Sequence, residues 1–73
     1  MLFTKPHITE NVKPVNEKNL ENLVEKYRNS NTFPLAKIYI SWSNFLKLSI
    51  VEISGVRILP GTGLQDYEVH LLT

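Results

Sequence analysis

The chain of 73 residues contains no cysteine, so disulfide bonds and thiolate metal sites are excluded. Its two histidines, His7 and His70, have no second histidine or carboxylate at ligand spacing on a shared helix face. We therefore expect no metal site and no cofactor. A core of this size rarely contributes more than about 3–5 kcal/mol, so small domains usually need a disulfide, a metal or self-association. Self-association, or docking on a larger partner, is the stabilising device that remains.

An excess of charge of one sign is also missing. Eight Lys and Arg residues face seven Asp and Glu residues, for a net charge of +1. A typical nucleic-acid binder has a bulk positive charge, so a basic function would have to come from local clustering. Apolar runs are only a few residues long, against roughly 20 for a membrane-spanning helix. The N-terminus has no secretory-signal pattern, and we expect a soluble, cytoplasmic protein with no membrane partner.

The chain predicts a single α+β domain over residues 15–73, preceded by an extended N-terminal arm over residues 1–14. Pro6 and Pro14 remove backbone donors and favour extended conformations in the residues before them. Leu2, Phe3 and Ile8 are apolar, so the arm is expected to lie along the domain or to add a short strand at an edge.

An amphipathic helix is predicted over about 17–29. Asn16 is a good N-cap, because its side chain can accept from the free amides of the first turn. Val15 and Leu20 have the spacing of a hydrophobic staple. One apolar stripe at i, i+3, i+4 and i+7 is formed by Leu20, Leu23, Val24 and Tyr27.

From Leu35 the apolar period changes to two, which predicts strands over about 35–41 and 45–53. A two-residue turn at Ser43-Asn44 would mix core and solvent residues on one face, so we reject it. A loop with an odd number of residues places six apolar side chains on the core face, as the pairs Ile40 with Leu46, Ile38 with Leu48, and Ala36 with Ile50. The opposite face then carries Tyr39 beside Lys47.

Two further strands are predicted over about 56–59 and 65–72. Ser54-Gly55 indicates a two-residue hairpin turn that pairs Glu52 with Arg57. A β-bulge near Ile50-Val51 would explain why the alternation slips there. The Pro60-Gly61-Thr62-Gly63 stretch indicates a loop with a type II turn. The predicted fold is an N-terminal helix packed on a bent antiparallel β-meander of three to four strands.

No motif for catalysis is present. The Pro60–Gly63 loop lacks the lysine and the following helix of a phosphate-binding P-loop, and a plain β-turn explains it. None of the serines lies in a nucleophile elbow. We expect a protein that is not an enzyme and has no small-molecule substrate.

One constellation of exposed side chains is the candidate binding site. It combines cations on the outer sheet face with aromatic residues at the adjoining loop, namely Lys37, Tyr39, Trp42, Phe45 and Lys47. An ordinary half-solvated sheet face is the simplest interpretation. Trp and Tyr are also favoured anchors for a protein partner, and aromatic rings between lysines can stack bases and meet phosphates.

Part of the chain resembles a known family. Residues 34–59 have a similar rhythm to the Sm-like fold, especially bacterial Hfq, with Ile38-Tyr39-Ile40 opening a strand. Gln65 and His70 stand at positions similar to those of the second Hfq motif. The glycine and the acidic residue of the first Sm motif are missing at the corresponding turn. The resemblance implies a ring-shaped, RNA-binding oligomer.

These observations give two functional hypotheses. The first is a small non-catalytic interaction protein that binds another protein, or itself, through a sheet face or edge. Compact chains of this size are common among phage and mobile-element accessory factors. The alternative is a single-stranded RNA- or DNA-binding module, which would bind with strong salt dependence.

Overall fold

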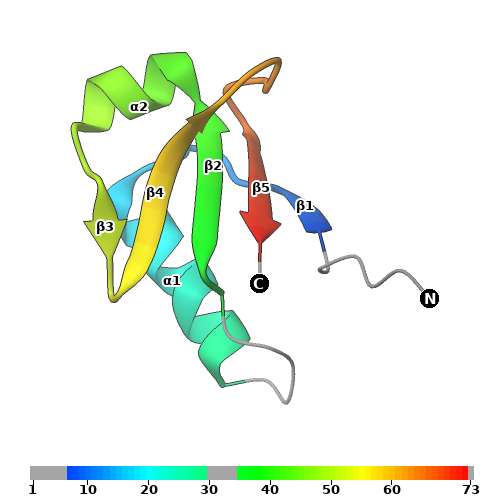
Figure 1. Cartoon of the computed structure of the whole chain (residues 1–73), viewed down its shortest axis with the longest axis vertical. Coiled ribbons are helices and arrows are strands. Elements are labelled where there is room, and N and C mark those ends of the chain that lie inside the picture. The colour runs from blue at the N-terminus through cyan, green and yellow to red at the C-terminus, as the bar shows by residue number, and fades with distance from the viewer. Residues whose placement is uncertain (1–6, 30–34, 73) are drawn as a thin grey trace.

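In a computed structural model, which describes residues 7–29 and 35–72, the chain is a small α+β protein with a mixed sheet. The five strands of this sheet are β1 (His7–Asn11), β2 (Lys37–Ser41), β3 (Glu52–Ile53), β4 (Val56–Gly61) and β5 (Glu68–Leu72). Two helices, α1 (Glu17–Arg28) and α2 (Trp42–Leu48), complete the described part (Figure 1). The strand order is β1-β5-β2-β4-β3.

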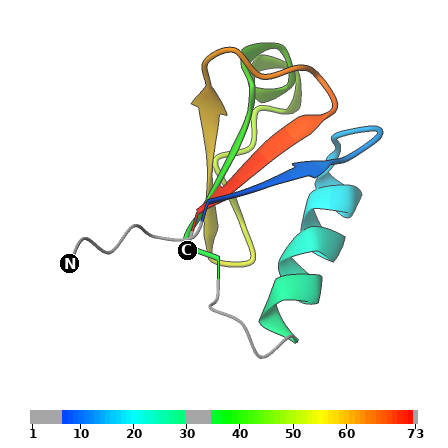
Figure 2. The ribbon, with the colours of Figure 1, turned by 90° about the vertical axis from the view of Figure 1, so that its right-hand side faces the viewer.

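Helix α1 begins and ends close to the predicted positions. The Asn16 side chain caps it by accepting from the Asn19 backbone amide at 2.8 Å. In the last turn, the Asn29 backbone amide donates to the Glu25 carbonyl. Val15 and Leu20 are both buried, as the hydrophobic staple requires. The apolar stripe of α1 packs against one face of the sheet, and Figure 2 shows the helix on that side.

The predicted strand over 45–53 is wrong for residues 45–48, which belong to helix α2, and only its end, Glu52–Ile53, forms a strand, β3. Ser41 caps this helix by accepting from the Asn44 amide at 3.2 Å, and Ser49, at φ 54°, ends it in the left-handed region. Phe45 and Leu48, three residues apart, pack against the core, whereas Leu46 is 68 % exposed. The predicted pairs of Ile40 with Leu46 and Ile38 with Leu48, and the bulge near Ile50, therefore do not form.

The sheet is mixed and not antiparallel throughout. After β2, helix α2 and strand β3 bring the chain back to the end of the sheet at which β2 began, so β4 runs in the same direction as β2. Strand β2 pairs in parallel with β4, with Lys37 opposite Arg57 and Tyr39 opposite Leu59. It pairs antiparallel with β5, with Tyr39 opposite His70. This parallel pair departs from the antiparallel succession on which the resemblance to the Sm-like fold rests.

The predicted hairpin is confirmed in register. Glu52 pairs with Arg57 and Ile53 with Val56, and both turn residues have positive φ, 50° at Ser54 and 85° at Gly55. The predicted loop at 60–63 is shorter in the structure, since Pro60 and Gly61 belong to β4 and pair with Ile40 and Ser41. Strand β3 does not extend opposite Pro60, so no ladder partner there needs the amide that proline lacks.

Within the predicted arm, residues His7–Asn11 form β1 and pair antiparallel with β5 at the edge of the sheet. The first six residues of the arm lie outside the described ranges. Glu10 of β1 accepts from the Tyr27 hydroxyl at 2.7 Å and lies 3.3 Å from the Lys26 ammonium, which ties the strand to α1. The Tyr27 hydrogen bond holds the pKa of Glu10 below its ordinary value; burial opposes this, and Lys26 adds to it. Burial and the same bond raise the pKa of Tyr27 to about 12.

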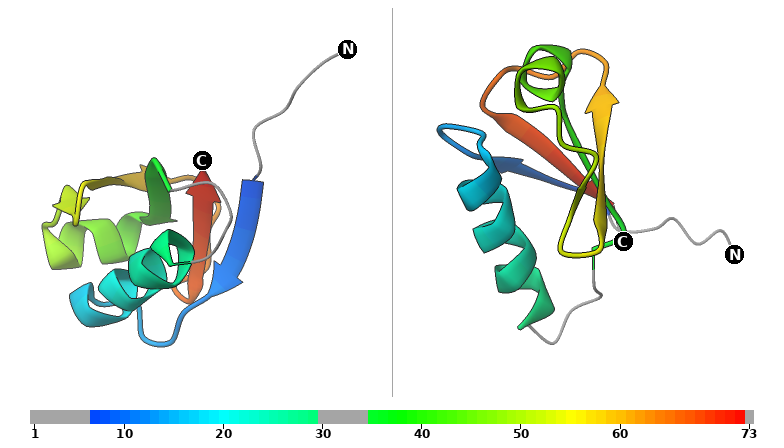
Figure 3. Two further views of the ribbon diagram at one scale, coloured as in Figure 1. Left: turned by 90° about the horizontal axis from the view of Figure 1, so that it is seen from below. Right: turned by 90° about the vertical axis from the view of Figure 1, so that its left-hand side faces the viewer.

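The core lies between the helices and one face of the sheet. Its buried residues come from α1, from the inner face of the strands, and from the segments before α1 and β2. They are Val15, Leu20, Leu23, Val24, Leu35, Ile38, Ile40, Ile53, Val56, Ile58, Val69 and Leu71. Because both helices contribute to this one side, the opposite face of the sheet is not covered by any described helix or strand (Figures 2 and 3).

Candidate functional site

The five residues predicted to form one site lie on two different elements. Lys37 and Tyr39 are on β2, on the sheet face opposite the core, as their alternation with buried Ile38 and Ile40 requires. The other three residues, Trp42, Phe45 and Lys47, are on α2. The expected contact of Tyr39 with Lys47 across a hairpin is therefore wrong, and two separate surfaces take the place of the single predicted strip.

The first surface, which we term the outer face, is built by residues that stand opposite one another on neighbouring strands. One row runs Thr9, His70, Tyr39 and Leu59, and the next runs Leu72, Lys37, Arg57 and Glu52. Tyr39 lies on the central strand, between His70 of β5 and Leu59 of β4, and is partly buried. The outer face is thus a continuous surface with an aromatic ring near its centre.

Lys37 and Arg57 place two cations side by side on the outer face. Like charges directly opposite on neighbouring strands destabilise a sheet. Among the described residues, neither forms an ion pair; the two pairs present join Lys26 to Glu10 and Arg28 to Glu25. Arg57 is exposed and Lys37 partly exposed, so the guanidinium of the one and the ammonium of the other can contact a bound anion.

A glycine shapes the environment of Tyr39. A Cβ atom at Gly61 would lie 2.7 Å from Leu64 Cδ1 and 3.2 Å from Tyr39 Cβ, so the absence of a side chain lets Leu64 fold against β4. Leu64 is partly buried there, beside the base of the tyrosine. A side chain at position 61 would therefore crowd both Leu64 and Tyr39.

The second surface, which we term the α2 surface, carries exposed apolar side chains. Trp42 is 54 % exposed and Leu46 is 68 % exposed, and a separation of four residues puts them on the same side of the helix. Trp42 also meets Phe45 edge to face, with ring centroids 6.1 Å apart. Since Phe45 is anchored in the core, this contact orients the indole on the helix surface.

Helix α2 is held firmly at its first turn. The buried Ser41 hydroxyl donates to the Asp66 carboxylate at 3.0 Å and accepts from the Asn44 backbone amide, and the Asn44 side-chain amide donates to the Asp66 carbonyl at 2.7 Å. These bonds join α2 to the turn before β5. The α2 surface is therefore presented by a fixed helix, although the helix has only seven residues.

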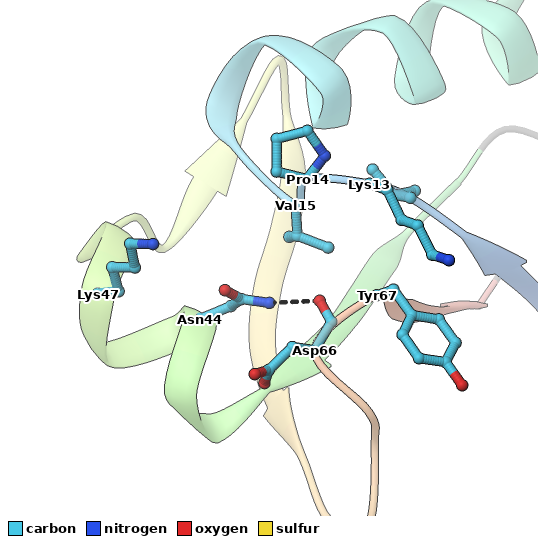
Figure 4. A pocket seen from close by; sticks show the side chains of 8 residues that line it. Lys13, Pro14, Val15, Asn44, Lys47, Asp66 and Tyr67 are labelled. Carbon is cyan, nitrogen blue, oxygen red and sulfur yellow. Dashed lines mark hydrogen bonds between the residues drawn. The ribbon is translucent and has the colours of Figure 1, made fainter.

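A hollow of about 370 Å³ lies beside this junction (Figure 4). It is bounded by the loop after β1, by α2 and by the turn before β5, through Val12, Lys13, Pro14, Val15, Asn44, Lys47, Asp66 and Tyr67. The Lys13 ammonium lies 4.9 Å from the centre of the Tyr67 ring. Lys47 lies on the opposite rim of the hollow in Figure 4. Because it belongs to α2, it is not part of the outer face.

Two residues of these surfaces escape prediction from sequence. Arg57 was assigned to a charge pair with Glu52, which hid its place beside Lys37 on the outer face. Leu46 was assigned to the core because it alternates with Leu48 and Ile50. The usable signal was the serine at position 41, a helix-capping residue, followed by Phe45 and Leu48 at helical spacing.

The described residues contain no group of three or more His, Asp or Glu side chains able to hold a metal ion. Within the same ranges, no helix combines the length and apolarity needed to cross a membrane. Comparison with protein-family models, with curated proteins and with solved structures finds no match to this chain.

Proposed function

We propose that this chain is a small non-catalytic interaction protein that binds another protein through the α2 surface. The observation that carries the proposal is the exposure of Trp42 and Leu46 on consecutive turns of one fixed helix. Tryptophan is enriched among the residues that dominate binding energy at protein interfaces. The outer ends of these side chains contribute little to the core, and together they form an exposed apolar patch, a kind of surface that marks interaction sites.

The occupant that fits this surface is a larger partner with an apolar groove. Trp42 and Leu46 expose on the order of 250 Å² together, whereas each side of a stable interface buries about 800 Å². Two copies of α2 alone would bury too little for a stable dimer. A groove that encloses both side chains uses them as anchors, in the way that amphipathic helices bind to grooves.

The charge of α2 indicates which charge the rim of that groove should have. Lys47 is the sole charged residue of α2, and it is exposed. A partner with acidic residues around its apolar groove would therefore be favoured over one with a basic rim, mainly through its association rate. The absence of cysteine agrees with a reducing compartment, and we propose the cytoplasm as the site of this interaction.

The experiment is a quantitative affinity purification from the source organism, followed by calorimetry with the purified partner. Trp42→Ala and Leu46→Ala should each weaken binding at least about tenfold, as expected for anchor residues. Val51→Ala is the matched control, because Val51 is 67 % exposed yet lies outside α2. Circular dichroism must show that all three variants are folded.

The following results would refute the proposal. One is a partner that binds the wild type and the α2 variants equally. The other is a stable homodimer in sedimentation velocity that Trp42→Ala dissociates, since this would make a second copy the occupant. Loss of binding in all variants including Val51→Ala would also count against a site on α2.

A further inference from the structure

We infer that the outer face binds single-stranded nucleic acid, with a base stacked on Tyr39 and neighbouring phosphates at Lys37 and Arg57. This inference is independent of the proposed function, because the residues that carry it lie on β2, β4 and β5 and none lies on α2. Its first support is architectural, since both helices pack on one side of the sheet and no described helix lies on the other side (Figure 3).

The second support is the pair of cations. Lys37 and Arg57 are direct neighbours across two parallel strands, and no carboxylate of the described residues forms an ion pair with either. Glu52 stands opposite Arg57 on the far side of β4 but is outside ion-pair distance. A bound polyanion would remove the repulsion between the two cations, and adjacent phosphates provide negative charges at a regular spacing.

The third support is the position of Tyr39. Its neighbours along β2, Ile38 and Ile40, fill the core, so the tyrosine ring lies on the uncovered side. Leu59 and His70 flank it on the adjoining strands, which makes a platform with the ring at its centre. Every base has a π-face, so such a platform stacks bases with little dependence on their identity.

An acidic peptide could satisfy the cations, but it would make no specific use of an aromatic ring. The variants Tyr39→Leu and Tyr39→Phe separate these occupants, because leucine keeps apolar area without a π-face and phenylalanine keeps the π-face. Nucleic acid predicts at least about fivefold weaker binding for Tyr39→Leu and near wild-type binding for Tyr39→Phe.

The assay is fluorescence anisotropy with labelled dT12 and U12 at 50 mM salt, using the full chain. With two phosphates neutralised, the plot of log K against log salt should have a slope of about −1.4. Lys37→Gln and Arg57→Gln should each reduce the slope to about −0.7. The controls are Lys18→Gln, an exposed lysine of α1, and Tyr67→Leu, an exposed tyrosine in the hollow of Figure 4. Both controls should bind as the wild type does.

The inference is overturned if neither oligonucleotide binds at 50 mM salt at millimolar protein concentration. It is also overturned if Tyr39→Leu binds as well as the wild type, or if polyglutamate of equal charge competes as well as dT12 does. Loss of binding in Trp42→Ala with retention in Tyr39→Leu would place the nucleic acid on the α2 surface instead. Because this assay contains no protein partner, its failure leaves the proposed function unaffected.

Discussion

The stability lost in Leu46→Ala distinguishes the helix at residues 45–48 from the strand predicted there. In a strand, Leu46 would face Ile40 inside the core, and its truncation would cost about 2–5 kcal/mol. In helix α2 the side chain is 68 % exposed. Full burial of a leucine contributes about 1.5–3 kcal/mol, so the buried third contributes roughly 0.5–1 kcal/mol. Alanine recovers a few tenths of this as the better helix former.

The expected destabilisation by Leu46→Ala is therefore below about 1 kcal/mol. Leu20→Ala is the matched control, because Leu20 is also a helical leucine but is completely buried. That variant should lose about 2–5 kcal/mol. For a domain of this size, 1 kcal/mol shifts the Tm by about 4–8 °C, so the two variants are readily distinguished.

Urea unfolding followed by circular dichroism measures both free energies, provided that the slope of the transition is the same in the two variants and the wild type. A loss of 2 kcal/mol or more in Leu46→Ala would refute the assignment of α2 and, with it, the α2 surface. Equal, small losses in both variants would refute the description of the core.

Three further predictions use thermal and urea unfolding. Ser41→Ala removes the α2 cap and the bond to Asp66 and should cost about 1–2 kcal/mol, whereas exposed Ser43→Ala should change stability by less than about 0.5 kcal/mol. Tyr27→Phe should cost about 1 kcal/mol at neutral pH, shrinking as Glu10 protonates below its unfolded pKa, and also above pH 10 as the tyrosine ionises. Ser54→Asn should stabilise by a few tenths of a kcal/mol, because asparagine tolerates the positive φ there.

The signs of the two pH effects follow from the directions of the pKa shifts. Glu10 has a lowered pKa when folded, so its contribution is present above the unfolded value and is lost as the pH falls through the folded one. Tyr27 has a pKa raised to about 12, so its contribution is complete below the unfolded value of 10.0 and is lost between there and about 12. The wild type should show both losses, and Tyr27→Phe should abolish the alkaline one. An unchanged alkaline limb in that variant would contradict the raised pKa of Tyr27, which burial and the hydrogen bond to Glu10 produce.

Helix α1 and the hairpin at Ser54 were predictable because each is specified by neighbouring residues. The cap at Asn16, the staple and the stripe all lie within thirteen residues of one another. The hairpin follows from Gly55 and from the register that it imposes on Glu52 and Arg57. In both cases local interactions and packing favour the same structure, and prediction from pattern succeeds.

Helix α2 was not predictable in this way, because its pattern fits two periods. Leu46, Leu48 and Ile50 alternate as in a strand, while Phe45 and Leu48 have helical spacing. Two hydrogen bonds favour the helix: the Ser41 hydroxyl accepts from the Asn44 backbone amide, and the Asn44 side-chain amide donates to the Asp66 carbonyl. The second of these is a contact over 22 residues, which no local pattern contains.

The parallel pairing of β2 with β4 depends on that same helix. With a short loop after residue 41 and a strand from residue 45, as predicted, the two strands can only run antiparallel, and a meander follows. With α2 as the connection, β2 and β4 run in the same direction and Arg57 comes to lie beside Lys37. The wrong prediction for residues 45–48 therefore led to a wrong predicted sheet topology, in which Lys37 and Arg57 are not neighbours. Lys37 and Tyr39 were placed on the correct face, because alternation within β2 does not depend on the partner strand.

The two surfaces follow from the same architectural constraint. A sheet with helices on one side must expose its other side, and a short connecting helix must turn one side to solvent. Polar residues would satisfy both requirements at a small loss of stability. The chain instead has Tyr39 on the central strand and Trp42 with Leu46 on the helix, where burial is incomplete. The proposed protein partner and the inferred nucleic acid would use these side chains. Because β2 and α2 are separate elements, the two ligands would bind without competition.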